Sequence, residues 1–354
     1  MKWRQTFLVT AFSYPVSKNR DSGVTTVDDF HQWANENKII RSVKVCQDDD
    51  KGGGKGLVAT RDLKPREIAI HVPRKMTIQT SGELDNNNWA GTLASKICQI
   101  QSEIDNESNN DITIDFGGDQ AYTWKPFSWK PYIEYGLPED GPYTTSHWED
   151  SELLQLQNET LVHEAYEWQE WREEQYARFS SNYSRENFDR ALSLVLSRVL
   201  DAGEGSHMLV PFIDNANHAS KEEGGGTFQL GSNSIVLMAG EYGVKKGEPF
   251  TLNYGNRCAD DFALTYGFVP HDCIGDSIPI PATDSIISWD TCFSQHGHAD
   301  RHVRRKCSEI LASYPTNLAE DEKMLRNQKS FDALTVALGY RCAKKRLLSK
   351  AAGI

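Results

Sequence analysis

The spacing of hydrophobic residues predicts a short helix followed by strands in the first part of the chain. Phe30 and Trp33 lie three positions apart, as on one face of a helix. Residues 39–46 read as a strand. Residues 57–73 read as two further strands, because valine and isoleucine dominate both sides of a turn at Pro65.

The pattern becomes helical between about residues 150 and 200. Residues 151–179 are rich in glutamate, and the apolar and aromatic positions that we expect to face inward are Leu153, Leu156, Leu161, Tyr166 and Trp171. Residues 185–200 are amphipathic, with Ser184 as the expected N-cap. The inner positions of this second helix are Phe188, Ala191, Leu192, Val195 and Val199.

Strands return after residue 200, in the segments HMLVPFI, GTFQL, SIVLMAG and PFTLNYG. Strands, then helices, then strands predict an α+β domain interrupted by a helical insertion. Residues 322–348 look helical again. The stretch 300–350 holds 12 basic and six acidic residues, which is typical of a solvated helix face or of a surface for an acidic partner.

Composition narrows the class of protein. The 354 residues suffice for one large domain or two ordinary ones, and their net charge of −12 argues against a protein that grips nucleic acid through a basic surface. No apolar run approaches the roughly 18 residues of a membrane span. The seven cysteines are widely spaced without a CxxC pair, which predicts neither a disulfide framework nor a structural zinc site. We expect an intracellular protein that acts as a monomer.

The N-terminus allows two interpretations. Residues 1–4 are basic, 6–12 are apolar, and 13–20 are polar and basic without acids. This order is typical of a degraded signal followed by a transit segment, which would place the protein in a plastid. The alternative is an unstructured N-terminus on a cytoplasmic protein.

A glycine-rich segment at Gly54-Lys55-Gly56 formally matches a dinucleotide-binding turn. That turn requires a helix to open at its last glycine, and Pro65 would break such a helix. A phosphate-binding P-loop fails as well, because glycine follows Lys55 where serine or threonine is needed. A flexible strand connection and a close approach of a ligand to the backbone both remain open.

A second polar cluster follows an apolar strand at Asp214, Asn215, Asn217 and His218. Taken alone, it is typical of an Asx-type turn. Some 36 residues later come two Tyr-Gly pairs, which begin at Tyr254 and Tyr266 and are consistent with aromatic packing beside tight turns.

Two further clusters are each consistent with an ordinary structural role. The dense group Cys292, His296, His298, Asp300 and His302 offers metal-ligand chemistry, but we expect a solvated loop there and no metal. For the aromatic group Trp124, Trp129, Tyr132 and Tyr135 we expect core packing.

The motifs in their order resemble a known family. The series GKGLVATRDLKPREIAIHVP, WKPYIEYGLPED, SRVL, LVPFIDNANH, NYG and YGF is similar to the SET-domain methyltransferases of the Rubisco large-subunit methyltransferase type, which include the actin histidine methyltransferase. The resemblance runs from Phe30 to Val269, about two thirds of the chain. Each motif is short, and it is their order that carries the match.

The resemblance implies a fold and a domain organisation. We expect small twisted β-sheets with a knot-like crossing over residues 28–270, interrupted by a helical insertion at about 80–200. Residues 1–27 would be disordered or a targeting segment. Residues 271–354 would form a shortened, mainly helical region that helps to bind the protein substrate.

The resemblance also implies S-adenosyl-L-methionine as cofactor and roles for named residues. Gly54, Lys55 and Gly56 would line the cofactor through backbone atoms, and Arg198 would stand near its carboxylate. Asn217 and His218 would contact it, His218 largely through its backbone near the adenine. Asp214 would support the crossing beside the cofactor. Tyr254 would be the active-site tyrosine, and Tyr266 would point toward the target amine.

Two positions bear on the acceptor. The actin histidine type carries an asparagine two places after the motif arginine and a tryptophan just before the motif aspartate, where this chain has Leu200 and Ile213. We therefore expect a protein-lysine methyltransferase. The alternatives are a protein-histidine methyltransferase and a SET-fold interaction protein without turnover.

Overall fold

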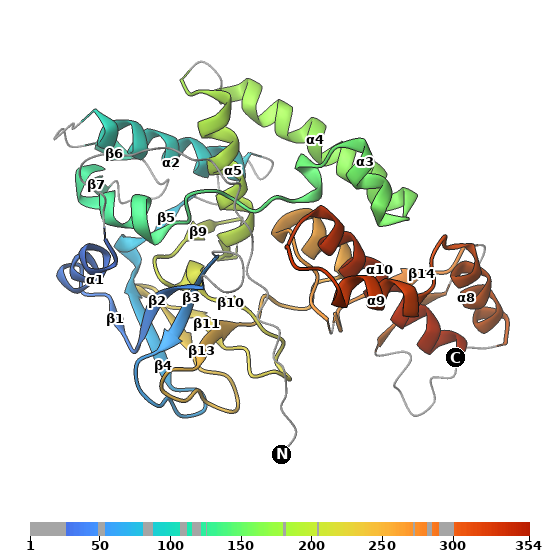
Figure 1. The fold of residues 1–354 in the computed structure, drawn as a ribbon. Coiled ribbons are helices and arrows are strands. Elements are labelled where there is room, and N and C mark those ends of the chain that lie inside the picture. Colours follow the sequence, from blue (N-terminus) through green and yellow to red (C-terminus); the bar gives the residue numbers. More distant parts are fainter. Residues whose placement is uncertain are drawn as a thin grey trace. The chain divides into compact units, whose positions relative to one another are not determined.

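A computed structural model describes residues 26–48, 54–80, 88–106, 112–114, 122–124, 126–179, 182–203, 205–271, 273–281, 285–289 and 301–354 (Figure 1). The chain divides into two compact units. The first comprises Met1–Pro142 and Trp171–Asn253, and the second Tyr143–Glu170 and Tyr254–Ile354. The expected targeting segment of residues 1–20 and most of the expected metal-ligand group lie outside the described residues.

Small sheets make up the strand part of the first unit (Figure 1). One has the order β1 (Ile40–Arg41), β4 (Ile68–Pro73), β12 (Ser234–Met238) and β11 (Thr227–Leu230), all antiparallel. The second has the order β10 (Asn217–His218), β13 (Pro249–Leu252), β3 (Gly54–Ala59) and β2 (Val43–Asp48). The remaining strands are β5 (Ile78–Gln79), β9 (His207–Leu209) and β8 (Leu200–Asp201) in a third sheet, and the pair β6 (Ile112–Ile114) and β7 (Tyr122–Trp124).

The strands expected from the sequence are confirmed. Residues 39–46 form two strands, β1 and the first part of β2, which belong to different sheets. Residues 57–73 contain the second half of β3 and all of β4, with the turn at Pro65 between them. The turn closes through a hydrogen bond from the Glu67 amide to the Lys64 carbonyl at 3.1 Å, with Arg66 in the left-handed region at φ 60°. Proline fixes φ at the position before Arg66, which favours this reversal.

The helices and helical turns of the first unit begin at α1 (Val27–Glu36), where the Thr26 side chain accepts from the Asp29 amide in a capping box. The others are η2 (Arg74–Met76), α2 (Trp89–Asp105), η3 (Pro126–Trp129), η4 (Tyr132–Gly136), α5 (Arg185–Arg198), η7 (Ile213–Asn215) and the later part of α4 (Glu159–Phe179). Ser184 caps α5 as expected, because its side chain accepts from the Asn187 amide.

An aromatic cluster anchors α1 in the core of the first unit. Phe30 is fully buried and stacks on Phe212 with ring centroids 4.4 Å apart, while Trp33 stacks on Tyr132 at 6.1 Å. The expected core packing of Trp129 and Tyr132 is confirmed by their burial. The side chain of Trp124 lies outside the described residues.

The second unit is mainly helical. It contains η5 (Thr145–His147), α3 (Asp150–Leu153), η6 (Leu154–Leu156), the start of α4, α6 (Ala259–Asp261), η8 (Phe262–Tyr266), the strand pair β14 (Ser277–Pro279) and β15 (Ile286–Ser288), α8 (Arg301–Ser313), α9 (Leu318–Arg326) and α10 (Ala333–Ala352). Within the described ranges, no helix of either unit is both long and apolar enough to cross a membrane.

Four helical details differ from expectation. Gln157 adopts φ 53°, so residues 151–179 form separate helices on either side of it. Tyr166 was expected inside but is exposed, because it lies on the solvent side of α4, where its hydroxyl donates to Asp150. Val199 lies beyond the end of α5 in extended backbone, and Asn327–Asp332 separate α9 from α10.

Buried charges hold α10 in the second unit. Arg341 and Lys345 are 2% and 0% exposed, and both bind the fully buried Asp321 of α9. Lys344, the neighbour of Lys345 in α10, binds Asp260 and also Asp276, the latter at 2.7 Å. Basic residues that looked like surface in the sequence are therefore part of the interior.

We expect Asp321→Ala to destabilise the second unit strongly. The substitution leaves two buried cations without their carboxylate, which costs about 3–5 kcal/mol in comparable sites. Thermal and denaturant unfolding would measure it against Glu309→Ala, which removes an exposed ion pair with Lys306 and should cost less than about 1 kcal/mol. Equal small losses in the two variants would contradict the importance of the buried network.

Candidate active site

The glycine-rich segment forms a strand, not a loop before a helix. Gly54–Ala59 is β3, so the dinucleotide-binding interpretation is excluded by the structure as well. β13 pairs with β3 on one side and, in parallel, with β10 on the other. Asn217 of β10 is thereby brought close to β3. A Cβ added to Gly56 would lie 2.9 Å from Asn217 Nδ2. The missing side chain thus allows the Asn217 amide to approach the backbone of β3 closely.

The Lys55 side chain connects β3 to η4 and to the residue that follows it. Its ammonium donates to the carbonyl oxygens of Tyr135 and Leu137, the latter at 3.0 Å, and lies 4.2 Å from the centroid of the Tyr135 ring. Burial, with a contribution from the nearby Arg198, lowers the pKa of Lys55 to about 8. Sequence reasoning assigned Lys55 only a backbone role, because the carbonyls lie 80 and 82 residues away.

Arg198 ends α5 with its guanidinium directed at η7. Its Nη1 donates to the carbonyl oxygen of Asp214. Its Nε is buried and has no hydrogen-bond partner among the described residues. A buried donor on a permanently charged group is costly unless an acceptor meets it, so this atom is suited to bind an anion.

Asp214 is the most enclosed of the expected site residues. The Tyr132 hydroxyl donates to one carboxyl oxygen, and Asn215 Nδ2 donates to the other at 3.0 Å. Asn215 also donates to the Gly136 carbonyl at 2.9 Å. Burial raises the pKa of Asp214 to about 7, against the lowering effect of these donors and of Arg198.

The expected cofactor residues therefore gather in the first unit, where Gly56, Lys55, Arg198, Asp214 and Asn217 are linked as described. His218 follows Asn217 in β10, half-buried and paired in register with Leu252. Tyr132 and Asn215 complete the arrangement. Tyr132 had been assigned to packing alone, since nothing in its local sequence indicates a partner 82 residues away.

The two expected tyrosines lie together in the second unit. The ring centroids of Tyr254 and Tyr266 are 5.0 Å apart, and Tyr266 is buried, which raises the pKa of its hydroxyl. Arg257 bridges them: its Nε donates to the Tyr254 carbonyl at 3.1 Å, and its guanidinium carbon lies 5.4 Å from the Tyr266 ring centroid. Arg257 was missed by sequence reasoning.

Comparisons with known proteins agree with this arrangement. Residues 298–348 match the family described as Rubisco LSMT substrate-binding. The chain is 21% identical to the chloroplastic [fructose-bisphosphate aldolase]-lysine N-methyltransferase of Arabidopsis thaliana, over 95% of this chain and 84% of that protein. It is 25% identical to the actin-histidine N-methyltransferase of Dasypus novemcinctus, over 73% of this chain and 46% of that protein. The chain thus spans about half the length of that relative.

Solved structures give the same result for the fold. The SET domain of LSMT bound to lysine and AdoHcy superposes with a TM-score of 0.60 at 17% identity, over 92% of this chain and 90% of that one. Rubisco LSMT bound to AdoMet superposes with a TM-score of 0.59 at 18% identity and the same coverage.

The fold is accordingly that of a SET-domain protein, α+β with small sheets and helices. The match to the substrate-binding family and the similarity to the named methyltransferases agree with this fold. The resemblance to the methyltransferases of the Rubisco large-subunit type is thereby confirmed. Together they support an S-adenosylmethionine-dependent protein methyltransferase.

We expect the stability of an Asp214→Asn variant relative to the unaltered protein to rise with pH. A carboxyl whose pKa is raised by folding contributes stability below its unfolded pKa of about 4, and this is lost as the pH rises through about 7. The loss amounts to about 1.4 kcal/mol for each unit of pKa change. Thermal unfolding of both proteins in matched buffers measures it. A difference that is constant between about pH 4 and pH 8 would show that Asp214 does not titrate there.

Proposed function

We propose that this protein transfers the methyl group of S-adenosylmethionine to a lysine side chain of a protein substrate. The observation that carries the proposal is the place where the Asn217 amide meets the side-chain-free backbone of Gly56, near Arg198, whose Nε is buried. These groups offer an amide, backbone atoms and an anion-binding donor within one small sheet and its flanking helix end.

The residues fit the proposed cofactor group by group. Arg198 Nε suits the carboxylate of its methionine part, since that atom is buried without a partner among the described residues. The backbone of Gly54–Gly56 and the Asn217 amide would contact the remainder, and the His218 backbone would lie near the adenine. Asp214, bound to Tyr132 and Asn215, would hold η7 in place beneath it.

When bound, the cofactor supplies a methyl group on a positively charged sulfur, ready for in-line displacement without metal or covalent intermediate. What the protein must do is align the acceptor, which is a proximity effect. The acceptor amine must also be neutral, against an ordinary lysine pKa of about 10.4. In the proposal the Tyr254 and Tyr266 hydroxyls orient this amine.

Two residues favour lysine over histidine as acceptor. Leu200 and Ile213 are 7% and 1% exposed, and they occupy the places where the histidine type carries asparagine and tryptophan. One relative, which aligns over 95% of this chain, is named for lysine methylation of an aldolase. A protein-histidine methyltransferase is the second candidate, because the actin-histidine enzymes also match. A SET-fold interaction protein without turnover is the third.

We further propose the domain roles that the resemblance implies. Residues 28–270 would form the SET domain, with the helical insertion at about 80–200. Residues 271–354 would contribute to substrate binding, which the family match over 298–348 supports.

The decisive experiment uses the purified full chain with methyl-labelled S-adenosylmethionine and, as acceptors, fructose-bisphosphate aldolase, actin and a cell extract. Acid hydrolysis of labelled protein distinguishes methyl-lysine from methyl-histidine. We expect methyl-lysine. Label in methyl-histidine would favour the second candidate, and cofactor binding without any transfer would favour the third.

We expect Gly56→Ala to weaken cofactor binding. The new Cβ would stand 2.9 Å from Asn217 Nδ2, so the asparagine must move from its position against β3. Calorimetric titration with S-adenosylmethionine should show a loss of about tenfold or more, and Asn217→Ala should act in the same direction. Gly339→Ala is the matched control, because its Cβ meets ordinary contacts at 3.5 Å. Unchanged affinity in both site variants would overturn the assigned pocket.

We expect Tyr254→Phe to keep cofactor affinity while lowering turnover by about 100-fold, since removing one preorganised polar group at a reacting centre has effects of that size. The phenyl ring preserves the contact with Tyr266. Calorimetry measures the first quantity and methyl transfer to the identified acceptor the second. Parallel losses of binding and turnover would mean that Tyr254 supports the fold instead of the acceptor.

A further inference from the structure

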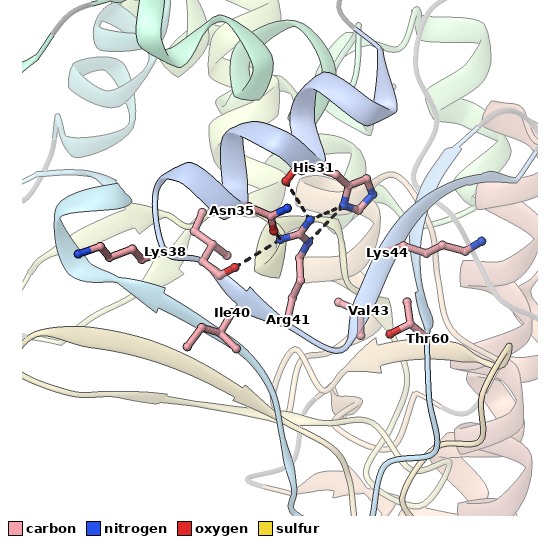
Figure 2. Close-up of a pocket in the computed structure, with 9 residues that line it drawn as sticks. His31, Asn35, Lys38, Ile40, Arg41, Val43, Lys44 and Thr60 are labelled. Atoms are coloured by element: carbon pink, nitrogen blue, oxygen red, sulfur yellow. Dashed lines mark hydrogen bonds between the residues drawn. The ribbon is translucent and has the colours of Figure 1, made fainter.

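A groove of about 500 Å³ lies between α1 and the strands β1 and β2 of the first unit (Figure 2). None of the residues that line it belongs to the site proposed for methyl transfer, and none is acidic. Its cations are Lys38, Arg41 and Lys44. The groove is therefore cationic, on a chain whose net charge is −12.

Arg41 forms the rigid middle of this groove. Its guanidinium donates to His31 Nδ1 at 2.8 Å and to Asn35 Oδ1 at 2.9 Å, and it lies 4.8 Å from the centroid of the Phe212 ring. Because arginine only donates, Nδ1 of His31 is the acceptor and the imidazole hydrogen is on Nε2. Burial and the charge of Arg41 lower the pKa of His31, which favours the neutral ring that accepts from Arg41.

Lys38 and Lys44 provide the free charge. Both are exposed, and neither forms an ion pair with any residue in the described part of the chain. Figure 2 shows them at opposite ends of the groove, directed away from one another, with Arg41 between them. One small anion could therefore not meet both ammonium groups, whereas an extended chain with several negative groups could.

The surroundings also suit an extended peptide. β1 lies at the edge of its sheet, and an edge strand offers backbone groups along which a second chain can lie. Ile40 of β1 is 69% exposed and adds an apolar contact beside the lysines. A nucleic acid would be repelled by the net charge of the protein as a whole, while a short acidic segment experiences mainly the local field.

We propose that this groove binds an acidic, extended peptide segment of a protein partner, with carboxylates at Lys38 and Lys44 and the chain following β1. The site is separate from the proposed methyl-transfer residues. It would hold a partner, or a remote part of a protein substrate, by charge and by strand contact.

Fluorescence anisotropy of the full chain with a labelled octapeptide of alternating glutamate and valine tests the proposal. We expect salt-sensitive binding that becomes about tenfold weaker in the double variant Lys38→Glu/Lys44→Glu, because two attractions become repulsions. The matched control is Lys64→Glu/Lys246→Glu, which changes the net charge equally at two exposed lysines of the same unit. It should bind within twofold of the unaltered protein, and both doubles should retain the unfolding temperature.

Three results would overturn the proposal. The first is no binding, which would mean that the groove does not recognise such a peptide, or equal weakening in both double variants, which would indicate only general electrostatic attraction. The second is full competition by inorganic phosphate at millimolar concentration, which would indicate a small-anion site. The third is equal binding of a single-stranded oligonucleotide through the same lysines. None of these results depends on methyl transfer, so the proposed function stands or fails separately.

Discussion

A single buried carboxyl holds the arrangement of the first unit together. Asp214 receives the Tyr132 hydroxyl from η4 and the amide of its neighbour Asn215, while its backbone carbonyl receives Arg198 from the end of α5. Segments that lie 82 and 16 residues away in the sequence therefore meet at one residue. Asn217 lies three residues after Asp214, so the η7 turn also sets its position. The close approach of Asn217 to Gly56 therefore depends on the same turn.

The electrostatics of this centre favour an anion. Arg198 lies close enough to Lys55 to disfavour the charge of the lysine, and the pKa of Lys55 falls to about 8 because of burial and this repulsion. A folded-state pKa below the ordinary lysine value means that the cation costs stability at neutral pH. This cost begins to fall as the pH rises above about 8 and is gone above the ordinary lysine pKa of about 10.4. An anion bound at Arg198 Nε would relieve the same repulsion, so ligand binding and stability are coupled here.

Local features of the fold could be predicted because their causes are local. The Ser184 cap and the strands on both sides of Pro65 depend on neighbours within a few residues. The contacts of Tyr132 and of the Lys55 side chain could not, since each joins segments some 80 residues apart. Tyr166 shows that helical spacing alone can also mislead. Its position in the pattern predicts burial, but it lies at the surface, where its hydroxyl donates to Asp150.

Composition misleads most where charges are buried. The excess of basic residues between 300 and 350 suggests a positive surface, yet Arg341, Lys344 and Lys345 are enclosed and bound to carboxylates from α9, α6 and Asp276. These cations fix the position of α10 and offer little to a partner. Lys38 and Lys44, by contrast, are accessible and line one groove, although the composition of their segment shows no excess of basic residues. Burial and pairing, not the count of charges, decide which basic residues are available for recognition.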